Sequence, residues 1–239
     1  MENNYEIENI IESIVNNCKD AGAISISETV TLGTYLCQAT EKFYLLLNNK
    51  NITISETTNF NGTFAISNLD NENYTFEIQT TSGFDNEIGS YLADFPYYTF
   101  EKWTGLTNIL QDLTGTIPTQ KERFPRLFLN EDISEDWIDE DKFNADIQLF
   151  FIINSQEKKR AAWRLENTMA YLIKFLNIFL ENLKNSEYVR SNKFIEFRKT
   201  KRFYDFTQST KQNKINSLVD VIELNVTGLK LFYKRQCNY

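Results

Sequence analysis

The stretch FNADIQLFFIINS, residues 143–155, decides how the rest of the chain is organised. Alternate residues are apolar, and Phe150 and Ile152 between them are apolar too, so the pattern predicts a strand covered on both faces. An amphipathic segment follows at once, with Ser155 placed to cap a helix. Its apolar residues recur at spacings of three and four: Ala162, Leu165, Met169, Leu172, Leu176, Phe179 and Leu183. We therefore predict a buried helix of about seven turns that ends near residue 187.

This predicted helix is apolar on more than one side. Its stripe is flanked by further large side chains: Trp163, Ile173, Phe175, Ile178 and Leu180. One interpretation is a central core helix. The other is a helix that packs on its own sheet and also on a neighbouring subunit, and in that case Trp163 and Phe175 are subunit contacts.

Upstream of this stretch the sequence pattern changes twice. Residues 4–21 have the apolar spacing of a helix, and Gly22 stands where a helix ends. Residues 24–95 are short runs of alternating apolar and polar residues separated by Asn-rich turns, which is typical of antiparallel strands, and KFYLLLN at residues 42–48 is one of these predicted strands. Within them, GTFAISNLDNENYTFEIQ resembles the repeated pattern of small Ig-like or carboxypeptidase-regulatory-like sandwiches. These residues therefore predict a small inserted all-β module.

Downstream, the residues around the central strand complete an antiparallel sheet. FPRLFLN, residues 124–130, is typical of a strand, with Pro125 near its start, where a missing N–H is tolerated. The chain ends in another strand, in which the apolar phase shifts by one residue and Gly228 marks a bulge. The expected fold class is α+β, an antiparallel sheet packed by a long central helix and an N-terminal helix. We assign this domain to residues 1–23 and 96–239 and the inserted small all-β (Ig-like) module to residues 24–95.

Composition excludes several classes of chemistry. The chain has no histidine, which removes Ser-His-Asp and Cys-His nucleophile systems and histidine zinc sites. The three cysteines are widely spaced without a CxxC pair, so neither a zinc site nor a disulfide framework is indicated, and a reducing compartment is expected. No run of about 18 apolar residues predicts a membrane span. We expect no enzyme, no cofactor and no metal, since only histidine-free chemistry such as Ser–Lys pairs or metal-bound carboxylates remains.

Charge is divided unevenly along the chain. Residues 1–154 hold 8 Lys+Arg and 25 Asp+Glu, a net of −17, and residues 155–239 hold 17 and 8, a net of +9, which together give −8. Such polarity favours head-to-tail contacts between copies, or between acidic and basic partners.

Two charged segments are candidate sites. The first is expected to be an acidic loop around Trp137, comprising Glu131, Asp132, Glu135, Asp136, Asp139, Glu140 and Asp141. It is either a solvated loop or a group of metal-binding carboxylates, and in a ring-shaped assembly it faces the lumen or the next ring. The second interleaves aromatic residues with a basic set: Arg190, Lys193, Arg198, Lys199, Lys201 and Arg202. This segment is interpreted as a subunit or partner contact, a DNA contact, or a solvated face.

The order of these elements resembles a known protein family. FPRLFLNEDI and NSLVDVIELNVTGLKL stand where tail-completion or tail-terminator neck proteins of tailed bacteriophages, especially crAss-like phages of Bacteroidota, carry a strand before an acidic loop and a closing strand. The resemblance covers residues 1–22 and 97–239. It implies a structural virion protein, without catalytic groups, that forms a homo-oligomeric head–tail connector ring between the portal complex and the tail.

The resemblance also implies partners and a location. The partners are copies of the chain, portal or adaptor proteins, tail proteins, and DNA that passes through the lumen without sequence-specific binding. The protein is then expected in the virion, assembled in the host cytoplasm, with no membrane partner. The alternative function is a binding module, in which the inserted strands recognise carbohydrate or protein, with Tyr74 as the aromatic candidate.

Overall fold

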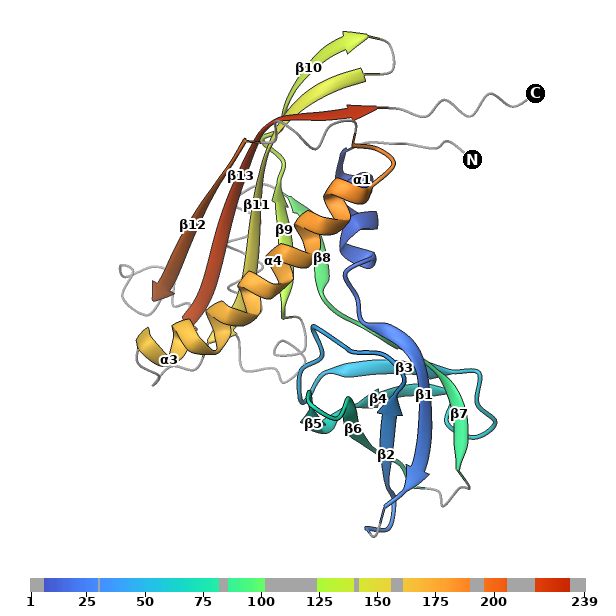
Figure 1. The fold of residues 1–239 in the computed structure, drawn as a ribbon. Coiled ribbons are helices and arrows are strands. Elements are labelled where there is room, and N and C mark those ends of the chain that lie inside the picture. Colours follow the sequence, from blue (N-terminus) through green and yellow to red (C-terminus); the bar gives the residue numbers. More distant parts are fainter. Residues whose placement is uncertain are drawn as a thin grey trace, which may run out of the picture. The chain divides into compact units, whose positions relative to one another are not determined.

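The chain forms two compact units. Residues 1–18 and 97–239 make the α+β unit, and residues 19–96 make the β module. Figure 1 shows both as ribbons. The computed structural model describes residues 7–29, 31–81, 86–101, 124–139, 142–155, 161–189, 196–205 and 218–232. The module begins five residues before the predicted start at residue 24, because the helix that precedes it is shorter than the apolar pattern indicated.

The α+β unit contains a six-stranded sheet in the order β12-β13-β11-β9-β8, with β10 paired to β11 beside this path. Every pairing is antiparallel except that of β8 with β9. The strands are β8 (Tyr97–Glu101), β9 (Arg126–Asn130), β10 (Ser134–Asp139), β11 (Lys142–Ser155), β12 (Glu196–Asp205) and β13 (Leu218–Phe232). The expected α+β fold class with a mainly antiparallel sheet is therefore confirmed.

The pairing of β11 with β13 is the longest in the sheet of the α+β unit. It runs from the pair Lys142–Phe232 to the pair Ser155–Leu218 and is interrupted once, between Ala145 and Ile147. At the interruption Gly228 has a φ of +66°, and its N–H donates to the Asp146 carboxylate at 2.7 Å. Glycine adopts this left-handed backbone conformation without steric cost. The Asp146 carboxylate accepts the hydrogen bond of the Gly228 N–H, which makes no bond to the neighbouring strand at the bulge. The predicted bulge at Gly228 is confirmed.

Helices cover one face of this sheet. Figure 1 shows α4 (Thr168–Asn185) lying across β11 and β13, and α1 (Ile7–Asn16) contacts both α4 and β8. The Phe151 ring of β11 meets Phe175 and Phe179 of α4 edge-to-face, with centroids 5.0 and 5.4 Å apart. Burying such aromatic side chains is the largest favourable contribution to packing at this layer.

The opposite face of the sheet is apolar as well. Phe128 of β9 and Phe150 of β11 pack with centroids 5.9 Å apart. They belong to a buried cluster: Phe124, Phe128, Phe150, Ile152, Val219 and Val221. The prediction that the central strand is covered on both faces is therefore confirmed.

The central helix differs from its prediction in three ways. Ser155 is the last residue of β11, paired with Leu218, so it does not cap a helix. The helical segment is divided into α3 (Ala161–Glu166) and α4 at Asn167, whose φ of −109° and ψ of −74° depart from regular helical values although its backbone N–H still donates to the Trp163 carbonyl at 3.0 Å. The first two residues of the predicted stripe, Ala162 and Leu165, are exposed. The buried face of α4 includes Phe175, which periodicity had placed at its flank.

The N-terminal helix is shorter than predicted at its C-terminal end. It ends at Asn16, and the backbone then tightens, with the Cys18 N–H donating to the Val15 carbonyl at 3.0 Å. Gly22 therefore lies inside the first strand of the module and is not a helix stop. The predicted apolar face is confirmed, with Ile7, Ile10, Ile11, Ile14, Val15 and Cys18 buried.

The β module contains a seven-stranded antiparallel sheet in the order β4-β3-β7-β1-β2-β6-β5. Its strands are β1 (Ala21–Glu28), β2 (Thr34–Ala39), β3 (Asn51–Ser55), β4 (Gly62–Ala65), β5 (Ser67–Asp70), β6 (Thr75–Gln79) and β7 (Glu87–Ala93). The first and last strands are neighbours, since Ala21 pairs with Leu92 and the Ala93 N–H donates to the Asp20 carbonyl at 2.8 Å. The two ends of the module therefore lie together.

One predicted strand of the module is wrong. The apolar run KFYLLLN, residues 42–48, is not a strand. The Asp20 carboxylate binds the backbone of this segment. One of its oxygens accepts a hydrogen bond from the Tyr44 N–H at 2.7 Å, and the other accepts one from the Leu45 N–H. Phe43, Leu45 and Leu46 are still buried, so this segment caps the core without joining the sheet.

Candidate functional site

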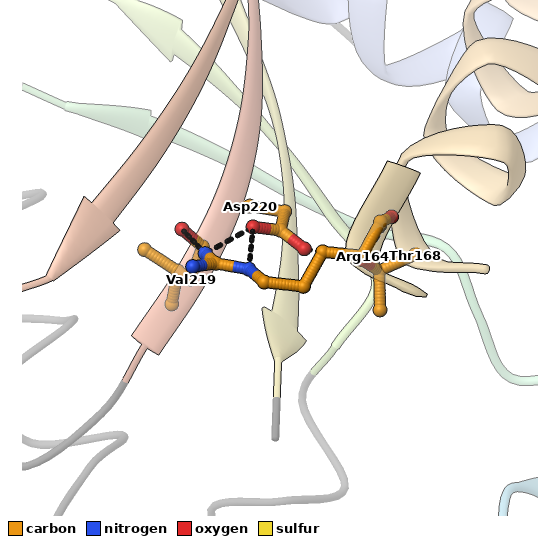
Figure 2. Close-up of polar contacts among 4 residues, drawn as sticks. All are labelled: Arg164, Thr168, Val219 and Asp220. Atoms are coloured by element: carbon orange, nitrogen blue, oxygen red, sulfur yellow. Dashed lines mark hydrogen bonds and ion pairs between the residues drawn. The ribbon is translucent and has the colours of Figure 1, made fainter. Parts of the chain in front are cut away.

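A buried ion pair joins the helical layer to the sheet of the α+β unit. Figure 2 shows the Arg164 side chain of α3 reaching the Asp220 carboxylate of β13. Arg164 Nε donates to Asp220 Oδ1 at 2.8 Å, and Nη2 donates to the same oxygen and to the Val219 carbonyl at 3.4 Å. The Thr168 hydroxyl, one turn along the helix, donates to Asp220 Oδ2. Asp220 is fully buried and Arg164 is 8% exposed, so water contributes little to their solvation.

This cluster is suited to holding elements in place. Both carboxylate oxygens of Asp220 accept hydrogen bonds, and its charge is neutralised by a guanidinium in direct contact. Thr168 Oγ1 also lies 2.9 Å from the Arg164 carbonyl, at the junction of α3 and α4. The ion pair therefore fixes that junction over the start of β13.

A second polar group crosses the other face of the sheet. The Asn130 amide donates to Gln148 Oε1 at 3.1 Å, and the Gln148 amide donates to Glu223 Oε1 at 2.9 Å. The Asn225 amide also donates to Glu223 Oε1, at 3.2 Å. Asn130 and Glu223 are buried, and the row links β9, β11 and β13. All the donors in this row are neutral side-chain amides. The row therefore adds side-chain hydrogen bonds to the backbone pairing of the three strands, and it lacks the paired acid and base of a catalytic site.

Sequence reasoning missed both polar groups, although a signal was present. Asp220 stands in the apolar run LVDVIELNV, and Arg164 stands between Trp163 and Leu165. A charge at such a position is costly unless a partner of opposite charge is buried with it.

The predicted basic segment is a strand over most of its length. Arg198, Lys199, Lys201 and Arg202 lie in β12, which pairs with β13 from Glu196–Thr227 to Asp205–Leu218. Arg190 and Lys193 lie outside the described residues. The structure thus places four of the six basic residues together on a terminal strand of the sheet.

The acidic segment is not the loop that the sequence predicted. Glu131 and Asp132 lie in the connection after β9, whereas Glu135, Asp136 and Asp139 lie on β10, which forms a hairpin with β11. Residues 140 and 141 lie outside the described ranges. Charge had suggested a loop, but the backbone pairs with β11 from Ser134–Asp146 to Trp137–Phe143.

The two aromatic residues proposed as subunit contacts differ in accessibility. Trp163 is partly exposed on α3. Phe175 is fully buried against Phe151 in its own subunit, so its proposed contact with a second copy is wrong. The wide apolar surface of the helix is explained at this position by the sheet beneath it.

The described cysteines are poorly suited to nucleophilic catalysis. Burial raises the pKa of the Cys18 thiol to about 11, and a hydrogen bond from Asn182 only partly opposes this. Burial also raises the pKa of Cys37 to about 12. A thiol reacts as the thiolate, so both side chains are inert at neutral pH while the protein is folded.

The described residues form neither a metal cluster nor a membrane span. Among them, no three Asp, Glu or Cys side chains gather in a way that could hold a metal ion. No helix in the described part of the chain has both the length and the hydropathy to span a bilayer. No protein-family model matches this chain, and no curated protein sequence matches it. The functional argument therefore depends on the residues and their arrangement.

Proposed function

We propose that this protein is a self-assembling structural subunit that forms a ring in the neck of a tailed-phage virion, between the portal complex and the tail. The observation that carries the proposal is the order of elements in the α+β unit. An N-terminal helix, the strand RLFLN of β9, the acidic β10, the long β11, a helical layer and a closing strand follow one another. This is the order on which the resemblance to tail-completion and tail-terminator proteins depends.

The arrangement of polar groups supports a structural role. The two buried polar groups, around Asp220 and around Glu223, hold elements together, with donors on both oxygens of Asp220 and on Oε1 of Glu223. Helix α4 belongs to the packed layer that lies over the sheet, and the ring is built from the sheet's remaining surfaces. Double-stranded DNA crosses the ring without sequence-specific contacts, and the net charge of −8 disfavours its adhesion.

The proposal is tested by the size and shape of the purified protein. Sedimentation and negative-stain electron microscopy are expected to show closed rings, and mass spectrometry of purified particles should find the chain in the neck. A protein that stays monomeric at high concentration, and that is missing from particles, would contradict the proposal.

The alternative, a binding module, is favoured by one observation. On β7, Ile88 is 78% exposed and Leu92 is 48% exposed, so the Ig-like module that we infer from the sequence presents an apolar outer surface. Tyr74, the expected aromatic contact, packs edge-to-face on Phe43 with centroids 6.1 Å apart. Binding of the full chain to a glycan array, lost in an Ile88→Ser/Leu92→Ser variant, would favour this function over the structural one.

A further inference from the structure

Three strands of the six-stranded sheet, β8, β10 and β12, have an outer edge that no described strand pairs with, and β10 and β12 are the two that carry several charges. β12 is the terminal strand of the main path and pairs only with β13 over ten successive residues. β10 pairs only with β11. An open edge presents backbone N–H and C=O groups that another strand can complete. The two edges lie on opposite sides of the β11–β13 ladder.

The two edges carry opposite charge. β12 contains four basic and two acidic residues in EFRKTKRFYD, a net of +2, and β10 contains three acidic residues and no basic ones in SEDWID, a net of −3. Pairing of β12 with β12, or of β10 with β10, would oppose like charges across the strands. The other terminal strand, β8, has Glu101 as its only charge and is a poorer match for β12. Charge therefore selects β10 as the complement of β12.

Exposure of β10 supports the same pairing. Glu135 and Asp136 are exposed, and Ile138 is 57% exposed, although it is a large apolar residue on a strand. Asp136 and Ile138 both stay exposed although the pairing of β10 with β11 shifts register between Trp137 and Asp139. A strand added at this edge would cover Ile138 while placing basic residues near the acidic ones, so apolar burial and charge act together.

We propose that β10 of one copy pairs with β12 of the next copy, so that the sheet continues from subunit to subunit. The inference rests on the proposed self-assembly and names the contact that produces it. Because the two surfaces differ, the contact is heterologous, and repeating it around an axis closes a ring. Arg198, Lys199, Lys201 and Arg202 then act in subunit contact, opposite Glu135, Asp136 and Asp139 of the neighbour.

The first test uses the wild-type protein. A mixture of unlabelled and ¹⁵N-labelled protein is treated with a carbodiimide, which joins a carboxylate to a lysine amine only when the two are in contact. Mass spectrometry is expected to find mixed-isotope peptides that join Glu135, Asp136 or Asp139 to Lys199 or Lys201. Assembled protein whose mixed-isotope links join other surfaces would overturn the β10–β12 contact while leaving self-assembly intact. Protein that does not associate would overturn both.

The second test exchanges the charges. A Glu135→Lys/Asp136→Lys variant has two basic edges, and a Lys199→Glu/Lys201→Glu variant has two acidic edges. Each alone should associate at least about tenfold more weakly than wild type. An equimolar mixture should recover assembly, because each altered edge then meets its complement. The control is Glu28→Lys/Glu72→Lys in the β module, which makes the same charge change as Glu135→Lys/Asp136→Lys on residues outside β10 and β12 and should assemble normally.

The recovery decides the outcome. Thermal unfolding of each variant is measured first, and the four substitutions combined in one chain provide a second route to matched edges. If either single-edge variant assembles like wild type, or if folded variants fail to recover when mixed and when combined, the proposed contact is wrong.

Discussion

The two units stabilise their sheets differently. In the α+β unit, long strands are covered on one face by α1 and α4, and the helical layer is joined to β13 by a single buried ion pair among the described residues. In the β module, short strands pack on aromatic side chains such as Tyr35 and Phe60, whose ring centroids are 4.8 Å apart. The turns of the module are held by side chains that accept hydrogen bonds from the backbone, as Asp20 does for Tyr44.

This difference predicts different responses to single substitutions. Helix–sheet packing in the α+β unit depends on a few contacts that are buried together, so losing one affects the whole layer. Polar contacts of the module such as those of Asp70 and Glu87 are exposed and lie in different turns, so each has a smaller local effect. Cys18 lies in the α+β unit and Cys37 in the module, and both are buried, so their alkylation rates report the opening of each unit separately.

The largest change removes the module. Replacing residues 19–96 by a short Gly/Ser bridge is expected to leave an α+β unit that unfolds in one cooperative thermal transition. The reason is that the module's first and last strands pair with each other, Ala21 with Leu92, so the excised ends are close together. The fragment 19–96 made alone should also fold. Loss of a cooperative transition in the deletion variant would show that the two units do not fold independently.

Element types were predictable where one period persisted. The alternating residues of β11 and the phase shift at Gly228 were correctly interpreted from the sequence, because burial on a sheet face repeats every two residues. The residues of α1 that face the core were correct as well. What periodicity could not give was where the helices end. The predicted helix is divided at Asn167 by a local departure of the backbone from helical φ and ψ, and the residues after Asn16 belong to a turn and to β1.

The candidate site was predictable in charge but not in structure. The basic and acidic segments were identified from composition. Composition did not show that both are strands of one sheet, because this depends on their pairing with β13 and β11. The same limit applies to residues 42–48, where an apolar run predicted a strand. Its backbone donors go to Asp20, more than twenty residues earlier, and no local pattern reveals that bond.

A smaller change tests the ion pair of the α+β unit. Asp220→Asn is expected to destabilise this unit by about 3–5 kcal/mol, because Arg164 keeps its charge in a buried site without a matching carboxylate. In a Cys237→Ser background, alkylation of Cys18 should become faster in the variant, while alkylation of Cys37 in the module should not change.

Two controls sharpen this test. Asp136→Asn removes the same charge from an exposed position on β10 and should leave Cys18 protected. Arg164→Met/Asp220→Leu, which removes both charges, should be less destabilised than Asp220→Asn alone. Equal acceleration of both cysteines would mean that the units open together, and the comparison between them would fail.

The smallest effect concerns a turn of the module. Glu87 accepts hydrogen bonds from the Thr58 N–H and from the Asn59 side chain, both at 2.6 Å. Partial desolvation raises the pKa of Glu87, but these bonds and that of the Asn59 N–H outweigh it, so the net pKa is lowered. A lowered folded-state pKa means that the charged carboxylate stabilises the folded module above the pKa of the unfolded chain. This contribution is lost as the pH falls through the folded-state value.

Glu87→Gln should therefore lower the thermal midpoint of the module near neutral pH, and the difference from wild type should shrink as the pH falls from about 5 to about 3. Calorimetry across this range measures the difference directly. Combining the substitution with Asn59→Ala supplies the matched cycle: the two effects should be less than additive, because both remove the same contact. A difference that stays constant with pH would show that the Glu87 charge does not hold this turn.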